Sequence, residues 1–205
     1  AVAQIDGSVA ARVQVQVPEG GLSVEPEVHG LAVRGLGTEQ WAHMRTSCGP
    51  HTALPARHWL TRSVLAVEDQ RFDEHPGYDT QELLASLTRN QQAGAIRRGG
   101  STLTQQLARL MVTGQERSLQ RKLRELLYAL DAEGTLGKAR ILQLYLANAP
   151  WGQDAQGRLV CGAGAAAKHY FGVPAARLTP HQAVTLAAML HNPRMEAERL
   201  AVQGS

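Results

Sequence analysis

Apolar and polar residues alternate strictly near the start of the chain. The run Val13-Gln14-Val15-Gln16-Val17 has the period of two that is typical of a β-strand, and Pro18-Glu19-Gly20-Gly21 then supplies a turn. Glycines at positions 30, 35 and 37 divide the stretch that follows. The pattern predicts short strands between residue 12 and about residue 36.

The hydrophobic period becomes helical after Pro55. Leu60, Val64 and Val67 recur at helical spacing, which predicts a helix that ends near Glu68 and Asp69. Similar patterns predict helices over residues 80–89, 102–111, 138–147 and 180–190. One more helix is expected from a leucine stripe formed by Leu119, Leu123, Leu126, Leu127 and Leu130.

The helix predicted over residues 180–190 has a clear start signal. Thr179 and Gln182 have the spacing of a capping box, with Pro180 at the first helical position. Taken together, the patterns predict a mainly α chain with a small N-terminal β segment. We expect the boundary between residues 40 and 55, which divides the chain into a β-rich segment over residues 1–45 and a helical domain over residues 46–205.

Composition narrows the possible classes of protein. With 205 residues and 43% hydrophobic content, the chain can bury a core of its own. No apolar run approaches the roughly 20 residues that cross a bilayer, and the N-terminus lacks the layout of a signal peptide, so we expect any membrane anchor to lie outside this sequence. Cys48 and Cys161 follow no CxxC spacing, which argues against a zinc or thioredoxin-like site and leaves one long-range disulfide open. Such a bridge would favour an oxidising compartment.

Charge is concentrated in one part of the chain. Residues 89–124 carry eight Lys or Arg and one acid, a local charge of +7, although the whole chain carries only +3. Such sorting predicts an anionic partner, although a solvated helix face can also be basic. A pI of about 9.1 would suit nucleic acid, but aromatics make up only 4% and no nucleic-acid-binding motif is present, so we expect no nucleic-acid partner.

An acidic segment follows the first predicted helix. Residues 68–79 hold five carboxylates and one imidazole. Glu68, at the end of an apolar helix, is a candidate general base, whereas the plainer interpretation is an acidic surface loop. A metal site is a weaker alternative, because the candidate ligands lack a clear register: Asp69, Asp73, His75 and Asp79.

A glycine turn and a basic helix come next. Gly99 and Gly100 precede a helix start marked by Thr102 and Gln105, which predicts outward-facing backbone N–H groups able to bind phosphate, or else an ordinary capped helix. The turn is not a P-loop, since no Lys-Ser/Thr follows at the required spacing. Arg117, Arg121 and Glu125 then lie four apart on one helix face. The base precedes the acid, the less stabilising order, which favours a functional reason for the charges.

Taken in order and with matching gaps, five segments between residues 57 and 193 resemble the motifs of the peptidoglycan glycosyltransferases, the lysozyme-like polymerase domain of class A penicillin-binding proteins and its monofunctional relatives. The first two motifs match Glu68-Asp69, Phe72, His75 and Gly77, and then Gly100-Ser101-Thr102 with Thr104-Gln105-Gln106. The remaining three match Arg121-Lys122 with Glu125, then Lys138, Ile141, Leu142, Tyr145 and Leu146, and finally His191-Asn192-Pro193.

The resemblance implies a lysozyme-like domain that polymerises lipid II into β-1,4 glycan strands and releases undecaprenyl pyrophosphate. Glu68 would be the general base that takes the proton from the acceptor 4-hydroxyl as this attacks the donor anomeric carbon with inversion. Glu125 would be the second catalytic carboxylate, near the donor pyrophosphate. The other matched positions would bind substrate: Asp69, Phe72, His75, Gly100, Ser101, Thr102, Thr104, Gln105, Gln106, Arg109, Arg117, Arg121 and Lys122.

The same resemblance implies the surroundings of the reaction. The partners would be lipid II, the growing glycan strand and the membrane surface at the periplasmic face of the bacterial inner membrane. Six residues have two interpretations, either an apolar and basic surface that contacts this membrane or ordinary core packing: Leu83, Leu84, Leu87, Ile96, Arg97 and Arg98. No cofactor is required, a divalent cation (Mg²⁺ or Mn²⁺) assists some members, and no residues are assigned to a metal.

The chain departs from the family pattern in three places. Gln143 and Ala147 stand where Glu and Asn are usual, which predicts reduced or altered activity. Residues 153–160 form an insertion, expected to be a surface loop, and the N-terminal strands match nothing in the family. Two alternatives therefore stay open: a degenerate, non-catalytic binder of lipid-linked glycan, and a lysozyme-like peptidoglycan hydrolase that also uses Glu68.

Overall fold

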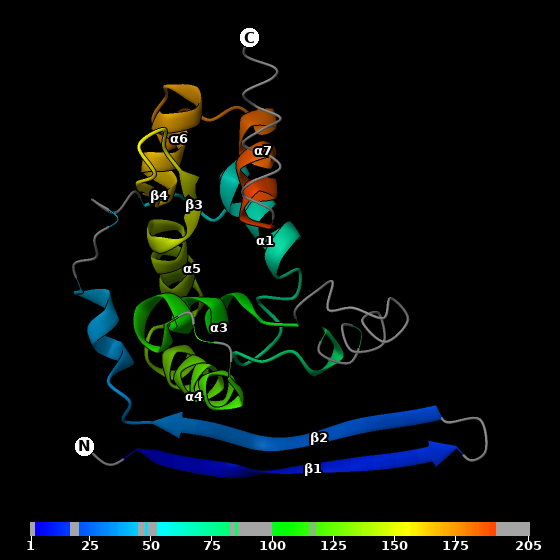
Figure 1. Ribbon diagram of the computed structural model, residues 1–205. Helices are drawn as coiled ribbons and strands as arrows, with labels where there is room; N and C mark the ends of the chain where they lie inside the picture. Colours follow the sequence, from blue (N-terminus) through cyan, green and yellow to red (C-terminus); the bar gives the residue numbers. More distant parts are fainter. Residues whose placement is uncertain are drawn as a thin grey trace.

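A computed structural model of the protein describes residues 3–16, 21–44, 48, 53–82, 85, 100–114, 116 and 118–191. Helices form the main body, and one long β-hairpin lies along one side of it (Figure 1). The helices are α1 (Trp59–Glu68), α3 (Leu103–Ala108), α4 (Leu119–Thr135), α5 (Gly137–Asn148), α6 (Ala163–Phe171) and α7 (Pro180–His191). The strands are β1 (Gln4–Gln16), β2 (Gly21–Arg34), β3 (Pro150–Gln153) and β4 (Leu159–Cys161). In the described parts of the chain, no helix is both long and apolar enough to cross a bilayer.

The N-terminal hairpin is longer and more regular than its sequence predicts. β1 and β2 pair antiparallel from Gln4 opposite Arg34 to Gln16 opposite Gly21, with one irregularity between Asp6 and Ser8. The expectation of several short strands starting at residue 12 is therefore wrong. The prediction failed because Gly30 was taken to interrupt a strand. Gly30 instead lies within β2, opposite the irregularity, with a φ of 59°, so the strand bends there and the pairing continues.

The segment that follows β2 is fastened to α4. The buried carboxylate of Asp131 accepts hydrogen bonds from the Thr38 backbone N–H at 3.3 Å, the Thr38 hydroxyl at 2.5 Å and the Leu36 N–H at 3.5 Å. In the short 3-10 helix η1 (Thr38–Ala42), Trp41 is buried and stacks on Tyr128 with ring centroids 6.1 Å apart. The division of the chain at residue 45 stays a prediction, but the chain is anchored to the helical body before that point.

Three predicted helices are confirmed with close boundaries. α1 ends at Glu68 and buries Leu60 and Val64 completely, mainly against α7. α5 covers the segment expected to be helical over 138–147. At the start of α7 the capping box forms in both directions, because the Thr179 N–H donates to the Gln182 side chain at 3.0 Å and the Gln182 N–H donates to the Thr179 hydroxyl at 3.3 Å.

Two other helices differ from their predicted extent. The helix expected over 102–111 ends at Ala108 and continues as a π-helical turn, η2 (Arg109–Thr113). Of the helix expected over 80–89, residues 80–82 and 85 are helical, Asp79 accepts a hydrogen bond from the Glu82 N–H at its start, and the rest lies outside the described residues.

The helix expected from the leucine stripe is α4, and the stripe is buried only in part. Leu130 is buried, but Leu123 is 55% exposed and Leu119 is 87% exposed. The first turns of α4 bury Glu125 instead, and Ala129 and Ala132 supply the close contacts further along. Spacing identifies an amphipathic helix, but only tertiary contacts decide which part of its apolar side is covered.

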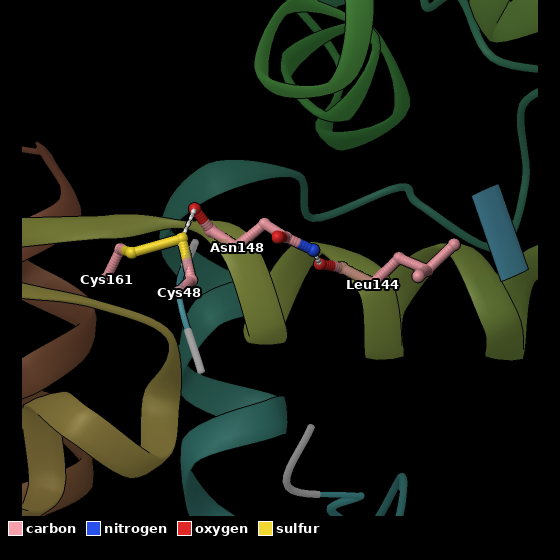
Figure 2. The surroundings of a disulfide bond; sticks show 4 residues. All are labelled: Cys48, Leu144, Asn148 and Cys161. Carbon is pink, nitrogen blue, oxygen red and sulfur yellow. Dashed lines mark hydrogen bonds between the residues drawn. A yellow bond between two sulfur atoms is a disulfide. The ribbon is translucent and has the colours of Figure 1, made fainter. Parts of the chain in front are cut away.

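A disulfide joins the segment before α1 to strand β4, which pairs with β3. Cys48 and Cys161 are joined, with Cα atoms 5.1 Å apart, which settles the pairing that the sequence left open. Figure 2 shows the bridge beside Asn148, whose side-chain amide turns back to donate to the Leu144 carbonyl at 2.7 Å. The insertion expected to be a surface loop is largely the turn of the β3–β4 hairpin, in which Asp154 accepts hydrogen bonds from two backbone N–H groups.

Candidate active site

Glu68 lines a cleft between the end of α1 and the start of α3. The cavity has a volume of about 380 Å³. Its walls come from the acidic segment that follows α1, the beginning of the helix at residue 80, and the Gly100-Ser101-Thr102 turn. The segments that match the first two motifs therefore meet in one place.

The carboxylate of Glu68 is held by two residues from different helices. Oε2 of Glu68 accepts a hydrogen bond from Nε2 of Gln106 at 2.9 Å, and Oε1 of Gln106 accepts one from the Tyr145 hydroxyl at 3.1 Å. Burial raises the pKa of Tyr145, and the nearby Glu68 carboxylate raises it further, so the phenol stays protonated and acts as a donor. Because Tyr145 occupies the amide oxygen of Gln106, the NH₂ group of Gln106 must face Glu68.

Asp69 and His75 join the acidic segment to α3. Nδ1 of His75 accepts the Gly77 N–H at 3.1 Å, which leaves Nε2 as the donor to both Asp69 oxygens at 3.0 Å. Oδ2 of Asp69 also accepts the Leu103 N–H at 2.8 Å. Both side chains are buried, at 8% and 6% exposure. Their substrate-binding role stays a prediction, while the contacts seen here fix the position of the helix that carries Gln106.

The candidate metal ligands do not come together. Asp79 pairs with Arg71 at 2.7 Å, Asp73 is exposed, and Asp69 and His75 bond to each other. Within the part of the chain that the structure describes, no group of three or more His, Cys, Asp or Glu side chains is arranged to hold a metal ion.

Other residues that match the family motifs are buried in or behind the walls of the cleft. Phe72 is 2% exposed, with the Lys138 ammonium 4.4 Å from its ring centroid. Thr102 donates its hydroxyl to the Gly77 carbonyl at 2.8 Å, and Thr104 donates its hydroxyl to Glu133 at 2.6 Å. Both threonines are buried, so with Phe72 they hold the walls of the cleft in place.

Of the two interpretations of the glycine turn and helix start, the structure favours the ordinary capped helix. Thr102 caps α3 and accepts the Gln105 N–H at 3.2 Å, while the Leu103 N–H is taken by Asp69. The sequence showed the capping threonine but not the distant carboxylate that satisfies the same helix end. Positive charge at this site must therefore come from side chains.

Those side chains come from α4. Lys122 donates three hydrogen bonds, to Ser101 Oγ at 2.6 Å, to Gln105 Oε1 at 3.0 Å and to Glu125 Oε2 at 3.0 Å. Arg121 donates to the other oxygen of Glu125, which is only 1% exposed. Because Ser101 also lines the Glu68 cleft, the basic helix is joined directly to that cleft.

Arg109 connects the two halves of the site. Burial lowers the pKa of Lys122 from its usual 10.5, and the neighbouring charges of Arg109 and Arg121 lower it further against the opposing effect of Glu125. Arg109 also partly opposes the rise in the pKa of Tyr145 that burial and Glu68 cause, so its charge acts on both the Lys122 side and the Glu68 side. Arg121 and Lys122 contact the single acid Glu125, and Arg109 adds a third positive charge near Lys122, so the surplus positive charge favours an anionic ligand.

The guanidinium groups retain hydrogen-bonding capacity. The Nε atoms of Arg109 and Arg121 are buried and, among the residues described, have no hydrogen-bond partner. Arg109 stands at the first position of the π-helical turn, a distortion that often occurs at functional sites. Arg117, predicted to join this group, lies outside the described residues, as do Arg97, Arg98 and Gly99.

Comparison with known proteins decides the family. A family model described as Transglycosylase matches residues 43–202 of the chain. The chain belongs to the transglycosylase family. The helices that dominate its described residues agree with the lysozyme-like, mainly α fold expected of a transglycosylase.

Several relatives carry the name biosynthetic peptidoglycan transglycosylase. The protein from Alcanivorax borkumensis is 46% identical over 137 residues, which cover 67% of this chain and 54% of the relative. Those from Nitrosomonas eutropha and Dechloromonas aromatica are 42% and 38% identical over 135 and 145 residues, covering 66% and 71% of this chain and 53% and 61% of the relatives. This transglycosylase chain therefore spans between half and two thirds of the length of these curated relatives.

The two departures in α5 lie away from the cleft of this transglycosylase. Gln143 and Ala147 are each two residues from Tyr145, a rotation of about 200° around the helix, so they face away from the side that meets Gln106. Gln143 accepts a hydrogen bond from Arg140 at 3.3 Å. Ala147 is 6% exposed, and a Cβ atom added at Gly162 would lie only 2.7 Å from its backbone oxygen. Both positions belong to the packing behind the site.

Tyr145 is the functional residue for which sequence reasoning assigned no role. It stood only as one match within the fourth motif. A usable signal was present, because Tyr145 is the polar aromatic in the otherwise aliphatic run Leu144-Tyr145-Leu146, where a buried hydroxyl needs a partner. The sequence could not show that this partner would be the amide beside Glu68.

Proposed function

We propose that this chain is an inverting peptidoglycan glycosyltransferase, which polymerises lipid II into β-1,4 glycan strands and releases undecaprenyl pyrophosphate. One observation carries the proposal: Ser101 lines the cleft of Glu68 and accepts a hydrogen bond from Lys122, so a carboxylate and a group of cations border the same space. The names of the relatives support the same chemistry.

The reaction divides between the two halves of the site. Glu68 takes the proton of the acceptor 4-hydroxyl, whose oxygen forms a bond to the donor anomeric carbon. The bond from that carbon to the diphosphate oxygen breaks, and the electron pair leaves with the diphosphate. Arg109, Arg121 and Lys122 stabilise the charge that develops on the leaving group. Glu125 keeps Arg121 and Lys122 in place, and its predicted catalytic role acts through them.

The competing functions explain fewer of these features. A hydrolase of neutral glycosidic bonds has no diphosphate to stabilise, so the cations of α4 and Arg109 would have no role. A degenerate binder was suggested by Gln143 and Ala147, but these residues face away from Tyr145 and leave the hydrogen bonds to Glu68 intact. The geometry therefore favours an active polymerase.

The substrate determines the surroundings of this activity. A polyprenyl diphosphate stays in a bilayer, so we place the reaction at the periplasmic face of the bacterial inner membrane, where the Cys48–Cys161 disulfide is stable. The apolar and basic residues between Leu83 and Arg98, for which a membrane surface and core packing were both open interpretations, lie outside the described residues. A divalent cation, Mg²⁺ or Mn²⁺, would arrive on the diphosphate oxygens, since the described carboxylates near Glu68 are already engaged.

Product analysis with labelled lipid II tests this function. The protein is incubated with lipid II in detergent, and the products are separated by length before and after treatment with a muramidase. We expect polymer that the muramidase degrades, together with released lipid diphosphate. Fragmentation of added glycan strands would favour the hydrolase, and bound but unchanged lipid II would favour the non-catalytic binder.

A further inference from the structure

The β1–β2 hairpin has an apolar face that the body covers only in part. Ile5, Val9, Val13 and Val15 share this face of β1 and are between 56% and 65% exposed. The opposite face is polar, and Arg12 pairs there with Glu27 at 3.6 Å. The two strands run past α4 and continue beyond it (Figure 1). A row of exposed β-branched side chains on a two-stranded sheet normally marks a binding surface.

One part of this face lines a cavity against α4. The cavity has a volume of about 280 Å³, and its walls are mostly apolar. The hairpin and α4 contribute the apolar lining residues Val9, Pro26, Val28, Leu31 and Leu126. Lys122 and Gly100 border the same space, so an apolar chamber has an ammonium group at its edge.

A second apolar row reaches this cavity along α4. Leu119 and Leu123 precede Leu126 by seven and three residues, which places all three on one side of the helix. Leu119 and Leu123 are the two exposed leucines of the stripe. Apolar rows from two elements therefore continue outward from one chamber, and Lys122 lies between Leu119 and Leu126 on the same side of the helix.

The chamber also adjoins the catalytic cleft. Asp79 and Gly100 line both spaces, and Lys122 donates to Ser101 in the wall of the cleft. An occupant that suits these walls has an anionic end for the cations and a long apolar remainder for the valines and leucines. A bilayer surface or a second copy of the chain would cover the apolar rows, whereas a single amphiphilic molecule would fill the chamber and also place an anionic end beside Lys122.

We propose that the apolar face of the β1–β2 hairpin, together with the Leu119–Leu126 side of α4, docks the polyprenyl chain of the lipid diphosphate whose head lies at Lys122. This inference rests on the proposed function, which supplies the diphosphate. The hairpin part of this surface precedes residue 43 and lies outside the segment that matches the family, whereas Leu119–Leu126 lies within that segment.

Binding of two soluble probes, inorganic pyrophosphate and farnesyl diphosphate, tests the proposal. Both are titrated by calorimetry into the wild type, into the double variant Val9→Asn/Val13→Asn, and into Ala10→Asn as a matched control on the polar face. Burial of only two methylene equivalents is worth about tenfold in Kd. We expect the wild type and the Ala10→Asn control to bind farnesyl diphosphate at least about tenfold more tightly than pyrophosphate.

The double variant should lose most of that difference and keep the wild-type Kd for pyrophosphate, which also shows that it is folded. If the double variant kept the wild-type ratio of the two Kd values, for pyrophosphate and farnesyl diphosphate, the proposal would be overturned. This holds even if the variant lost binding to phospholipid vesicles or lost self-association. If lipid II is polymerised and pyrophosphate binds but farnesyl diphosphate binds no more tightly, the docking surface alone is wrong. If pyrophosphate does not bind and lipid II is not polymerised, the proposed function fails, and the docking surface fails with it.

Discussion

Nε2 of Gln106 lies 2.9 Å from Oε2 of Glu68, so an amide of α3 directly holds the carboxylate at the end of α1. The orientation of this amide depends on Tyr145, which donates to its oxygen from α5. Three helices thus position one carboxylate. A base held in this way can meet an acceptor hydroxyl without first searching for its rotamer.

Removal of the Tyr145 hydroxyl should reduce turnover more than substrate binding. In Tyr145→Phe the oxygen of Gln106 loses its donor, so the amide no longer has a fixed orientation toward Glu68. One neutral hydrogen bond is worth about 1 kcal/mol, so we expect kcat for lipid II polymerisation to fall about three- to tenfold with KM nearly unchanged. Steady-state kinetics measure both constants.

Tyr170→Phe is the matched control for that variant. Tyr170 also donates its hydroxyl within the body, to the Trp151 carbonyl at 2.6 Å, but it lies outside the cleft. We expect this variant to keep the wild-type kcat. An equal loss of kcat in both variants would show that the effect of Tyr145→Phe is general destabilisation.

Asp69→Ala should act mainly on stability. The substitution leaves the buried His75 ring and the Leu103 N–H without their acceptor, at a cost of about 2–4 kcal/mol in the free energy of unfolding. Urea denaturation measures this change, and Asp73→Ala, an exposed position in the same segment, should change it by less than about 0.5 kcal/mol. Unchanged stability with a strongly raised KM would instead show that Asp69 contacts substrate.

The binding of pyrophosphate should weaken in alkaline solution because of Lys122. Burial lowers the pKa of Lys122 from 10.5, so the ammonium loses its proton at a lower pH than an exposed lysine does. As pH rises toward that lowered pKa, the charge and hence the affinity are lost. Lys122→Arg keeps its charge throughout this range and should abolish the loss. The same alkaline decline in both proteins would assign it to another group.

Reduction of the disulfide should destabilise the fold. The bridge joins residues separated by 113 positions, so it restricts a long loop of the unfolded chain. We expect dithiothreitol to lower the free energy of unfolding by about 2–5 kcal/mol. The double variant Cys48→Ser/Cys161→Ser should unfold equally easily with and without the reductant. If reductant left the wild type unchanged, the bridge would contribute no stability.

Local sequence signals predicted the elements whose contacts are mainly local. The spacing of Leu60 and Val64 identified α1, and the Thr179 capping box marked the start of α7, because both signals act within a turn or two. The hairpin was misjudged because glycine can either end a strand or bend it. The leucines of α4 predicted the helix but not which of them are buried, because burial depends on which distant element covers a face.

The site was predicted as a set of residues but not as a set of contacts. Motif order gave Glu68, Ser101 and Lys122 as site residues; in the structure Glu68 and Ser101 line one cleft, and Lys122 donates to Ser101. Two relationships are set by the tertiary fold alone and had no local signal: the hydrogen bond from the Leu103 N–H of α3 to Asp69 and the link from Tyr145 to Gln106. The first favours the capped-helix interpretation of the α3 start, and the second added a positioning residue.

The most direct test of the account is lipid II binding and turnover by Glu68→Gln. Glutamine keeps the size of the side chain and an oxygen that can accept from Gln106, but it cannot take a proton from the acceptor hydroxyl. We expect the variant to bind lipid II within about twofold of the wild type and to polymerise it at least about a hundredfold more slowly. Polymerisation by Glu68→Gln at a rate close to that of the wild type would contradict the assignment of Glu68 as the general base.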